Sequence, residues 1–200
     1  ITITGGLPAP HDMMSDYMHG KEGVDSMVNG QVNPTLTMKG GQVQRWRIIN
    51  ASNARFYRLA LESHTLHLIG TDGGLLDKPY ATSEILLSPG ERADILVKAT
   101  QASGSFRFQA LPYARHGNMT SSTVDLLTVN YSGSYPQSLP LSINTGAKRV
   151  VMDTSGLPHR TLSLSMAMGN GYINGQVFDL APFKIKSTGG NLEGWTNINK

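Results

Sequence analysis

The 200-residue sequence contains no cysteine, which excludes disulfides, thiolate metal ligands and cysteine nucleophiles. It also lacks any apolar run near the roughly 20 residues that a transmembrane helix needs. Its 17 Lys and Arg residues are scattered, and the net charge is only +3. Because phosphate-binding surfaces usually concentrate basic residues, we expect neither a nucleic acid nor a membrane as partner.

The familiar catalytic patterns are missing too. There is no Ser-His-Asp order, no glycine-rich phosphate loop and no zinc-ligand spacing. Four carboxylates lie in or beside expected turns, where such groups are usually solvated or cap the backbone: Asp72, Glu84, Glu91 and Asp94. Arg92 in "PGERAD" is expected to pair with a carboxylate and hold a hairpin. The sequence therefore predicts no catalytic and no cofactor-binding residue.

What the chain does contain is a repeat. The segment Asn29–Val32 reads "NGQV", and so does Asn174–Val177, 145 residues later. Trp46 and Trp195 follow these copies with an offset of 149 residues. An offset of this length corresponds to a domain rather than to a short solenoid repeat. We therefore expect a duplicated domain whose second copy is incomplete.

Short strand-like segments follow one another from about residue 26 to residue 131. In "QVQRWRIIN", Trp46 and Ile48 fall on one face of a strand, and Arg45 and Arg47 fall on the other. About eight or nine such strands, separated by turn residues and without a convincing amphipathic helix, are typical of an all-β Greek-key sandwich or barrel.

The composition suggests four parts. Residues 1–25 form an N-terminal segment, 26–131 a complete domain, 132–160 a linker rich in Ser, Pro and Gly, and 161–200 the first strands of a further domain. An incomplete domain exposes an unpaired strand edge and half a core. We expect its strands to pack on the complete domain, to pair with another chain or to remain mobile.

Histidine and methionine provide the only metal-ligand candidates. His64 and His67 are three residues apart in a strand context, so they should face opposite sides, one packed inside and one in water. The segment from residue 11 to residue 19 combines thioether and imidazole groups, which suit Cu(I). Its candidate ligands are His11, Met13, Met14, Met18 and His19. His116 and Met119 form a second, weaker pair of candidate Cu(I) ligands. Alternatively, these methionines fill irregular gaps where the segment packs on the sandwich.

Three motifs occur in order: "RIINAS" at 47–52, "TDGG" at 71–74 and "SPGER" at 88–92. Together they resemble the middle cupredoxin domain of bacterial multicopper oxidases of the laccase-like and cuprous oxidase types. The resemblance is dense over residues 5–131 and looser over 161–199. Gly194 and Asn197 depart from it, since the family favours a longer or apolar side chain there.

The resemblance implies three related cupredoxin-like β-sandwich domains in the parent protein. The complete domain would be the second, and the strands after about residue 161 would begin the third. The family's copper ligands lie in the first and third domains, and none can be carried over onto this sequence. A parent of this type takes electrons from phenolic or organic substrates or from Cu(I), and reduces O2 to water.

The resemblance thus implies a non-catalytic structural piece of a periplasmic or extracellular copper-dependent oxidase. Copper would belong to the parent, none would bind this piece, and its partners would be the missing first and third domains. An alternative stays open: a copper-free cupredoxin module that binds protein partners or captures Cu(I). Self-association through the incomplete domain is a further expectation. An independent hydrolase or isomerase would need a nucleophile and base that the sequence does not offer.

Overall fold

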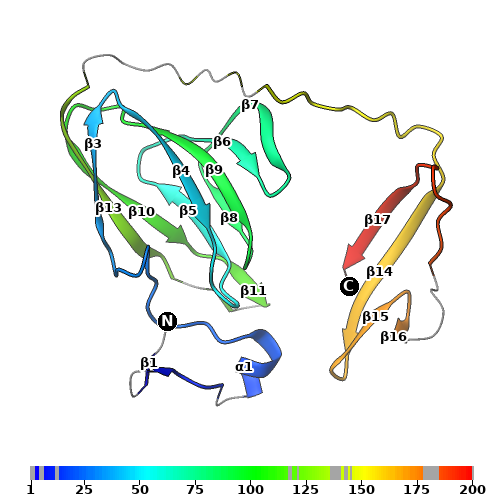
Figure 1. Cartoon of the computed structure of the whole chain (residues 1–200). Helices are drawn as coiled ribbons and strands as arrows, with labels where there is room; N and C mark the ends of the chain where they lie inside the picture. The colour runs from blue at the N-terminus through cyan, green and yellow to red at the C-terminus, as the bar shows by residue number, and fades with distance from the viewer. Residues whose placement is uncertain are drawn as a thin grey trace. The chain divides into compact units, whose positions relative to one another are not determined.

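A computed structural model describes residues 3–4, 7–11, 14–116, 119–120, 122–135, 141, 144, 146–177 and 185–199. The chain divides into two compact units, Ile1–Arg149 and Val150–Lys200. The boundary falls inside the predicted linker, although the predicted domain limits themselves stay predictions. Strands dominate both units (Figure 1). The helix α1 (Met14–His19) is short, and no helix in the described ranges is long and apolar enough to cross a bilayer.

The first unit is a sandwich of two sheets (Figure 1). The five-stranded sheet has the order β3 (Thr35–Gly40), β13 (Val124–Ser134), β10 (Gly104–Leu111), β5 (Tyr57–Leu61) and β8 (Ile85–Leu87). The four-stranded sheet has the order β4 (Val43–Ile49), β9 (Arg92–Lys98), β6 (Leu66–Thr71) and β7 (Gly74–Thr82). β3 runs parallel to β13, and the other neighbours are antiparallel. The predicted all-β, cupredoxin-like sandwich is confirmed.

Short strands complete the first unit: β1 (Ile3–Thr4) with β2 (Leu7–Pro8), and β11 (Ala114–His116) with β12 (Met119–Thr120).

The core lies between the two sheets and follows the alternation of the strands. Its most deeply buried side chains are Met38, Leu66, Ile95, Val97 and Val129. Trp46 and Ile48 pack against this core, whereas Arg45 and Arg47 are exposed. The Trp46 ring meets Phe108 edge-on, with centroids 5.4 Å apart. The predicted division of this strand into two faces is therefore confirmed.

Two features of the four-stranded sheet differ from the sequence-based expectation. β7 is a nine-residue strand that the pattern did not predict, because Pro79 interrupts it. Its edge position tolerates a residue without an N–H donor. Strict alternation along "RADILVK" predicts Ala93, Ile95 and Val97 on one face and Asp94, Leu96 and Lys98 on the other, yet Leu96 is buried as well. Asp94 lies within β9, not in a turn, and pairs there with Arg45.

The predicted Asn-Gly turn is present in both copies. Asn29 and Gly30 have φ angles of 51° and 80°. The backbone groups of Val28 and Gln31 exchange hydrogen bonds of 2.8 and 3.1 Å across this turn. Asn174 and Gly175 repeat the geometry with φ angles of 52° and 74°. Both central residues adopt positive φ, as a two-residue hairpin turn of this kind requires.

The second unit is one sheet in the order β16 (Gln176–Val177), β15 (Asn170–Ile173), β14 (His159–Ala167) and β17 (Gly194–Asn199). β17 runs parallel to β14. No residue of the described part of this unit is buried, so these strands form no closed core. Gly194 lies opposite His159, and a Cβ there would come within 2.4 Å of the imidazole ring. A larger residue at this position would therefore need the exposed His159 side chain to move.

Candidate functional site

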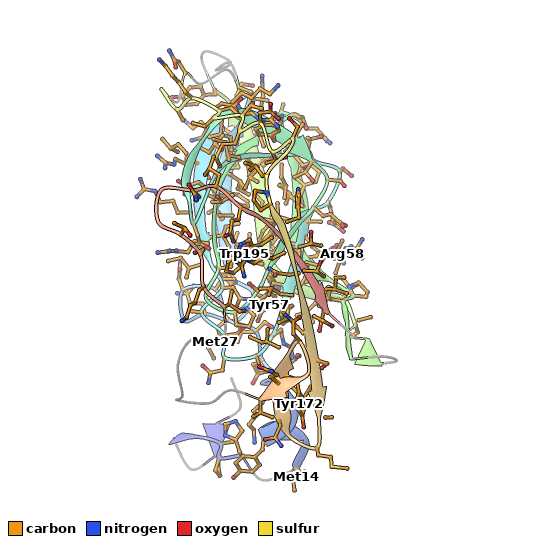
Figure 2. All side chains as sticks on the ribbon, turned by 90° about the vertical axis from the view of Figure 1, so that its right-hand side faces the viewer. Met14, Met27, Tyr57, Arg58, Tyr172 and Trp195 are labelled. Atoms are coloured by element: carbon orange, nitrogen blue, oxygen red, sulfur yellow. The ribbon has the colours of Figure 1, made fainter. Side chains whose placement is uncertain are left out.

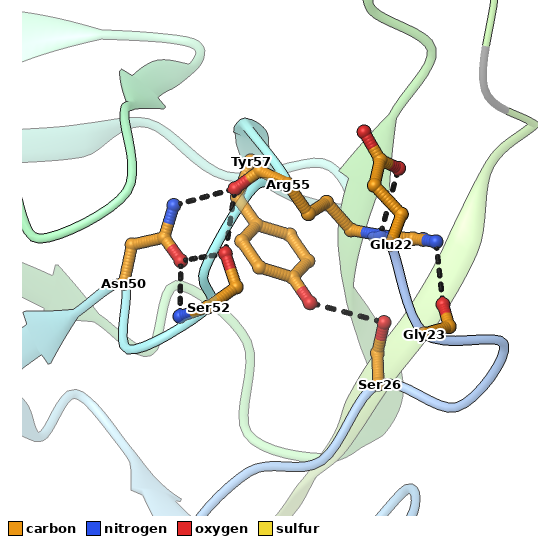
Figure 3. Close-up of polar contacts among 7 residues, drawn as sticks. All are labelled: Glu22, Gly23, Ser26, Asn50, Ser52, Arg55 and Tyr57. Carbon is orange, nitrogen blue, oxygen red and sulfur yellow. Dashed lines mark hydrogen bonds and ion pairs between the residues drawn. The ribbon is translucent and has the colours of Figure 1, made fainter. Parts of the chain in front are cut away.

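The loop between β4 and β5 carries the chain from one sheet to the other, and Asn50 organises it (Figure 3). The Asn50 amide nitrogen donates to the backbone oxygens of Arg55 and Leu87, at 2.8 and 3.0 Å. Its amide oxygen accepts from the backbone nitrogen and the hydroxyl of Ser52, at 3.1 and 2.7 Å. A side-chain amide offers two donor hydrogens and one acceptor oxygen with two lone pairs. The buried Asn50 uses all of them, which holds the loop in one conformation.

This loop in turn holds the N-terminal segment (Figure 3). The Arg55 guanidinium pairs with Glu22 at 3.2 Å and donates to the backbone oxygen of Gly23 at 2.7 Å. The hydroxyls of Ser26 and Tyr57 lie 3.2 Å apart. Because the Arg55 and Glu22 side chains are only 19% and 31% exposed, water screens their attraction incompletely. Residues 22–26 are therefore fastened to the sandwich at two points.

The chemistry of this site suits the positioning of chain, not catalysis. Its seven residues are Glu22, Gly23, Ser26, Asn50, Ser52, Arg55 and Tyr57. None is a histidine, and the one carboxylate is paired with Arg55. The site thus offers no base beside its serine hydroxyls. Its arrangement can set where the N-terminal segment leaves the sandwich.

The carboxylates of the first unit likewise have structural partners. Arg92 pairs with Asp72, as predicted, and its hydrogen bond lowers the pKa of that carboxyl group. Hydrogen bonds from Arg58 and Arg107 similarly lower the pKa of Glu84 and of Glu62. Glu91 accepts hydrogen bonds from the Ser88 backbone nitrogen and hydroxyl, at 2.8 and 2.9 Å, and so caps its turn as expected.

The two neighbouring histidines have different surroundings. His64 lies in the turn between β5 and β6, not in a strand, and is buried. Its ring nitrogens lie 2.6 Å from the backbone oxygen of Glu62 and 2.8 Å from the hydroxyl of Tyr131. His67 lies in β6 and is half-buried, and its Nδ1 has no hydrogen-bond partner in the described structure. Of the two histidines, His64 is thus the packed one, and His67 is partly covered beside its cross-strand neighbour Leu96, which is buried.

Comparison with known proteins identifies the family. The family model described as "Multicopper oxidase" matches residues 8–134. The chain belongs to the multicopper oxidase family. Among curated proteins, "Cell division protein FtsP" of Dickeya dadantii is 32% identical over 181 residues, which cover 84% of this chain and 37% of that protein. The FtsP of Escherichia coli K12 is 30% identical over 183 residues, with 85% and 37% covered. The chain spans little more than a third of these relatives.

Solved structures of the multicopper oxidase family agree with the fold. The multicopper oxidase of Campylobacter jejuni, whose description calls it a metallo-oxidase, is 27% identical with a TM-score of 0.72, covering 94% of this chain and 43% of that one. McoA of Aquifex aeolicus is 30% identical with a TM-score of 0.60, covering 74% of this chain and 33% of that one.

The residues of this chain do not fit the copper centres of a multicopper oxidase. A mononuclear blue copper centre needs a cysteine thiolate, and the sequence has no cysteine. Within the described ranges, no three His, Asp or Glu side chains are grouped so that they could hold a metal ion.

The Cu(I) candidates of the N-terminal segment are only partly described. His11 is exposed, with its ring 5.3 Å from that of Tyr17, and Met14 projects from α1 with 75% of its surface exposed (Figure 2). Met13 lies outside the described residues. So do the side chains of Met18 and His19, and of His116 and Met119 in the weaker candidate pair. Both groups of candidates stay predictions.

The roles of Asn50, Ser52 and Arg55 are not evident from the sequence. The pattern Asn-x-Ser after a strand was the available signal, since such side chains often bond the backbone two residues on. The bond from Asn50 to Leu87 spans 37 residues, and no local pattern could reveal it.

Proposed function

We propose that this chain is a structural, copper-free portion of a copper-dependent oxidase of the multicopper oxidase family. The absence of cysteine carries the proposal, because a member without the thiolate cannot itself hold the mononuclear blue copper. Copper bound elsewhere in the parent would supply one-electron chemistry. The parent would oxidise phenolic or organic substrates or Cu(I) and reduce O2 to water, in the periplasm or outside the cell.

In this proposal the sandwich spaces the neighbouring domains of the parent, which are its partners. The Asn50 loop supports such a role, since Arg55 and Tyr57 hold the N-terminal segment at a defined place on the sandwich. Rigid fixation of a connecting segment is what a spacer needs if the domains on either side are to keep a fixed distance.

Copper analysis tests the proposal. We expect the purified 200-residue chain to bind less than one Cu(II), to lack an absorption band at about 600 nm and to oxidise neither a phenol nor Cu(I). The full-length parent, expressed with added copper, should show all three properties. Stoichiometric copper with a blue band in the 200-residue chain would overturn the assignment.

The curated relatives named "Cell division protein FtsP" favour a second candidate, a copper-free module that binds protein partners. The copper content of the full-length parent separates the two. A parent that stays copper-free after growth in copper-supplemented medium would reject the oxidase and favour the module.

Cu(I) capture by the N-terminal segment has a separate test. Titration with Cu(I) should show a lower affinity for the triple variant Met13→Leu, Met14→Leu and Met18→Leu than for the unchanged chain. An unchanged affinity would remove the capture hypothesis.

A further inference from the structure

The sequence contains three Asn-Gly pairs, and the structure holds them differently. Asn29-Gly30 and Asn174-Gly175 occupy the matching two-residue turns of the repeat, whereas Asn170-Gly171 begins β15. All three asparagines are exposed. An asparagine that precedes glycine is chemically reactive, because glycine has no Cβ to hinder attack by its nitrogen on the neighbouring carboxamide. The three pairs thus share their local chemistry and differ in what holds them.

The carboxamide of Asn174 is attached to a neighbouring strand. Its oxygen accepts a hydrogen bond from the backbone nitrogen of Ser163 at 2.8 Å. The backbone nitrogen of Asn174 donates to the Ser163 oxygen, also at 2.8 Å. The residues on either side of the turn, Ile173 and Gln176, are paired between β15 and β16. Both the side chain and the turn of Asn174 are therefore fixed to the sheet.

The carboxamide of Asn29 lacks such an attachment. Its turn is closed by the two backbone bonds between Val28 and Gln31, which form an isolated bridge outside the named strands. Within the described part of the chain, the Asn29 side chain has no hydrogen-bond partner. Opening this turn breaks the bonds between Val28 and Gln31, whereas freeing Asn174 breaks its two bonds with Ser163 in addition.

Attack of the glycine nitrogen requires the backbone to leave its folded conformation. In a turn with positive φ at both central residues, the first of them directs the next nitrogen away from its own side chain. The reaction rate therefore follows the population of the opened turn. Asn170 is held in another way, because its backbone is paired with Ala167 in the ladder of β14 and β15. Asn29 is the least restrained of the three.

We propose that Asn29 is a site of spontaneous deamidation through a cyclic imide, and that Asn174 is protected from it. The Gly30 nitrogen attacks the carboxamide carbon of Asn29 and forms a carbon–nitrogen bond. The bond from that carbon to the amide nitrogen breaks, and ammonia leaves with the proton that the Gly30 nitrogen loses. Water then opens the imide at one of its two carbonyl groups, which gives aspartate or isoaspartate at position 29. The reaction consumes only water, so the inference is independent of the proposed function.

The products alter the chain next to a point where it is fastened to the sandwich. Either product adds a negative charge at position 29. Isoaspartate also adds a methylene group to the main chain, so the two-residue turn loses the geometry that joins Val28 to Gln31. The turn lies three residues after Ser26, whose hydroxyl is 3.2 Å from that of Tyr57. Deamidation therefore changes the connection between the N-terminal segment and β3.

Ageing of the purified 200-residue chain in mildly alkaline buffer tests the proposal. Asn29 lies on the tryptic peptide between Lys21 and Lys39, and tandem mass spectrometry resolves Asn170 from Asn174 on their shared peptide. Asn29 should convert about 5 to 30 times faster than Asn174, whose two additional hydrogen bonds must break first. A rate at Asn170 or Asn174 that equals or exceeds the rate at Asn29 would overturn the proposal.

The same chain unfolded in guanidinium chloride is the matched control, and it needs no substitution. Unfolding removes the turns and the bonds to Ser163, so the three asparagines should then react at similar rates. A preference for Asn29 that persists unchanged in the unfolded chain would show that the flanking sequence sets the rate, and would reject the role of the structure. Copper analysis of the parent does not depend on either result.

Discussion

At the scale of single residues, polar side chains decide how the first unit holds its neighbours. Arg55 is the clearest case, because one guanidinium contacts both the Glu22 carboxylate and the Gly23 backbone. A surface ion pair alone contributes little to stability. The added hydrogen bond to a backbone oxygen is what ties the pair to a particular path of the chain.

Replacing Arg55 should release the N-terminal segment. Arg55→Ala removes the ion pair and the bond to Gly23, which together contribute about 1–2 kcal/mol. Trypsin should then cleave after Lys21 about 5 to 30 times faster, because cleavage follows the population of the detached segment. Arg58→Ala is the control, since it also breaks an ion pair, with Glu84, but touches no residue of the segment. Equal acceleration in both variants would contradict the role of Arg55.

Tyr131 should make stability depend on pH in the alkaline range. Burial raises the pKa of Tyr131 to about 12, above the value of about 10 for an unfolded tyrosine. The folded state therefore favours the neutral phenol. Its contribution is complete below pH 10 and is lost as the pH rises from about 10 to about 12.

Urea unfolding at several pH values measures this effect. Tyr131→Phe should lower the unfolding free energy at pH 8 by about 1–2 kcal/mol, because it leaves a buried nitrogen of His64 without its partner. Between about pH 10 and 12, the unfolding free energy of the same variant should fall less steeply with pH, because the variant lacks the one proton that Tyr131 would release on unfolding. Identical slopes in the two proteins would show that Tyr131 does not titrate as inferred.

At the scale of elements, the end of β3 depends on a close approach between two segments of main chain. Gly40 ends β3 with its Cα beside the 101–102 turn. A Cβ at this position would lie 2.6 Å from the Ala102 Cα and 2.7 Å from the Gln101 oxygen. Both contacts are with main chain, which cannot rotate away as a side chain would.

Gly40→Ala should therefore destabilise the first unit by about 1–3 kcal/mol, the usual cost of overpacking. Gly73→Ala is the matched control, because its nearest atom would be the Thr71 hydroxyl at 3.8 Å. That variant should stay within about 0.5 kcal/mol of the parent chain. Chemical unfolding of both variants decides the matter, and equal stabilities would mean that the turn moves to admit the methyl group.

At the scale of the whole molecule, the two units differ in how much they bury. The first encloses a core between two sheets, whereas the described strands of the second bury no residue. Local stability follows buried apolar contacts. Hydrogen exchange should thus be much faster for the backbone amides of β14 and β15 than for those of β9 and β10. Comparable protection in the two units would show that the second gains a core by contacts outside its own sheet.

The sequence by itself determined the strand alternation, the Asn-Gly turns, the repeat and the absence of a thiolate ligand. The alternation and the turns depend on residues that are neighbours along the chain, the missing thiolate depends on composition, and the repeat depends on comparing two segments of the same sequence. The sequence also predicts a carboxylate partner for Arg92, but its identity as Asp72, in the turn between β6 and β7, depends on the pairing of β6 with β9.

Only the tertiary structure decided which faces are covered and which edges are open. Leu96 is buried and His67 is half-buried on the outer side of a sheet, although local alternation places Leu96 between Asp94 and Lys98. The Asn50 bond to Leu87 depends on strands brought together from distant parts of the chain. Local periodicity specifies the two sides of a strand, but burial and hydrogen bonding depend on what packs against each side.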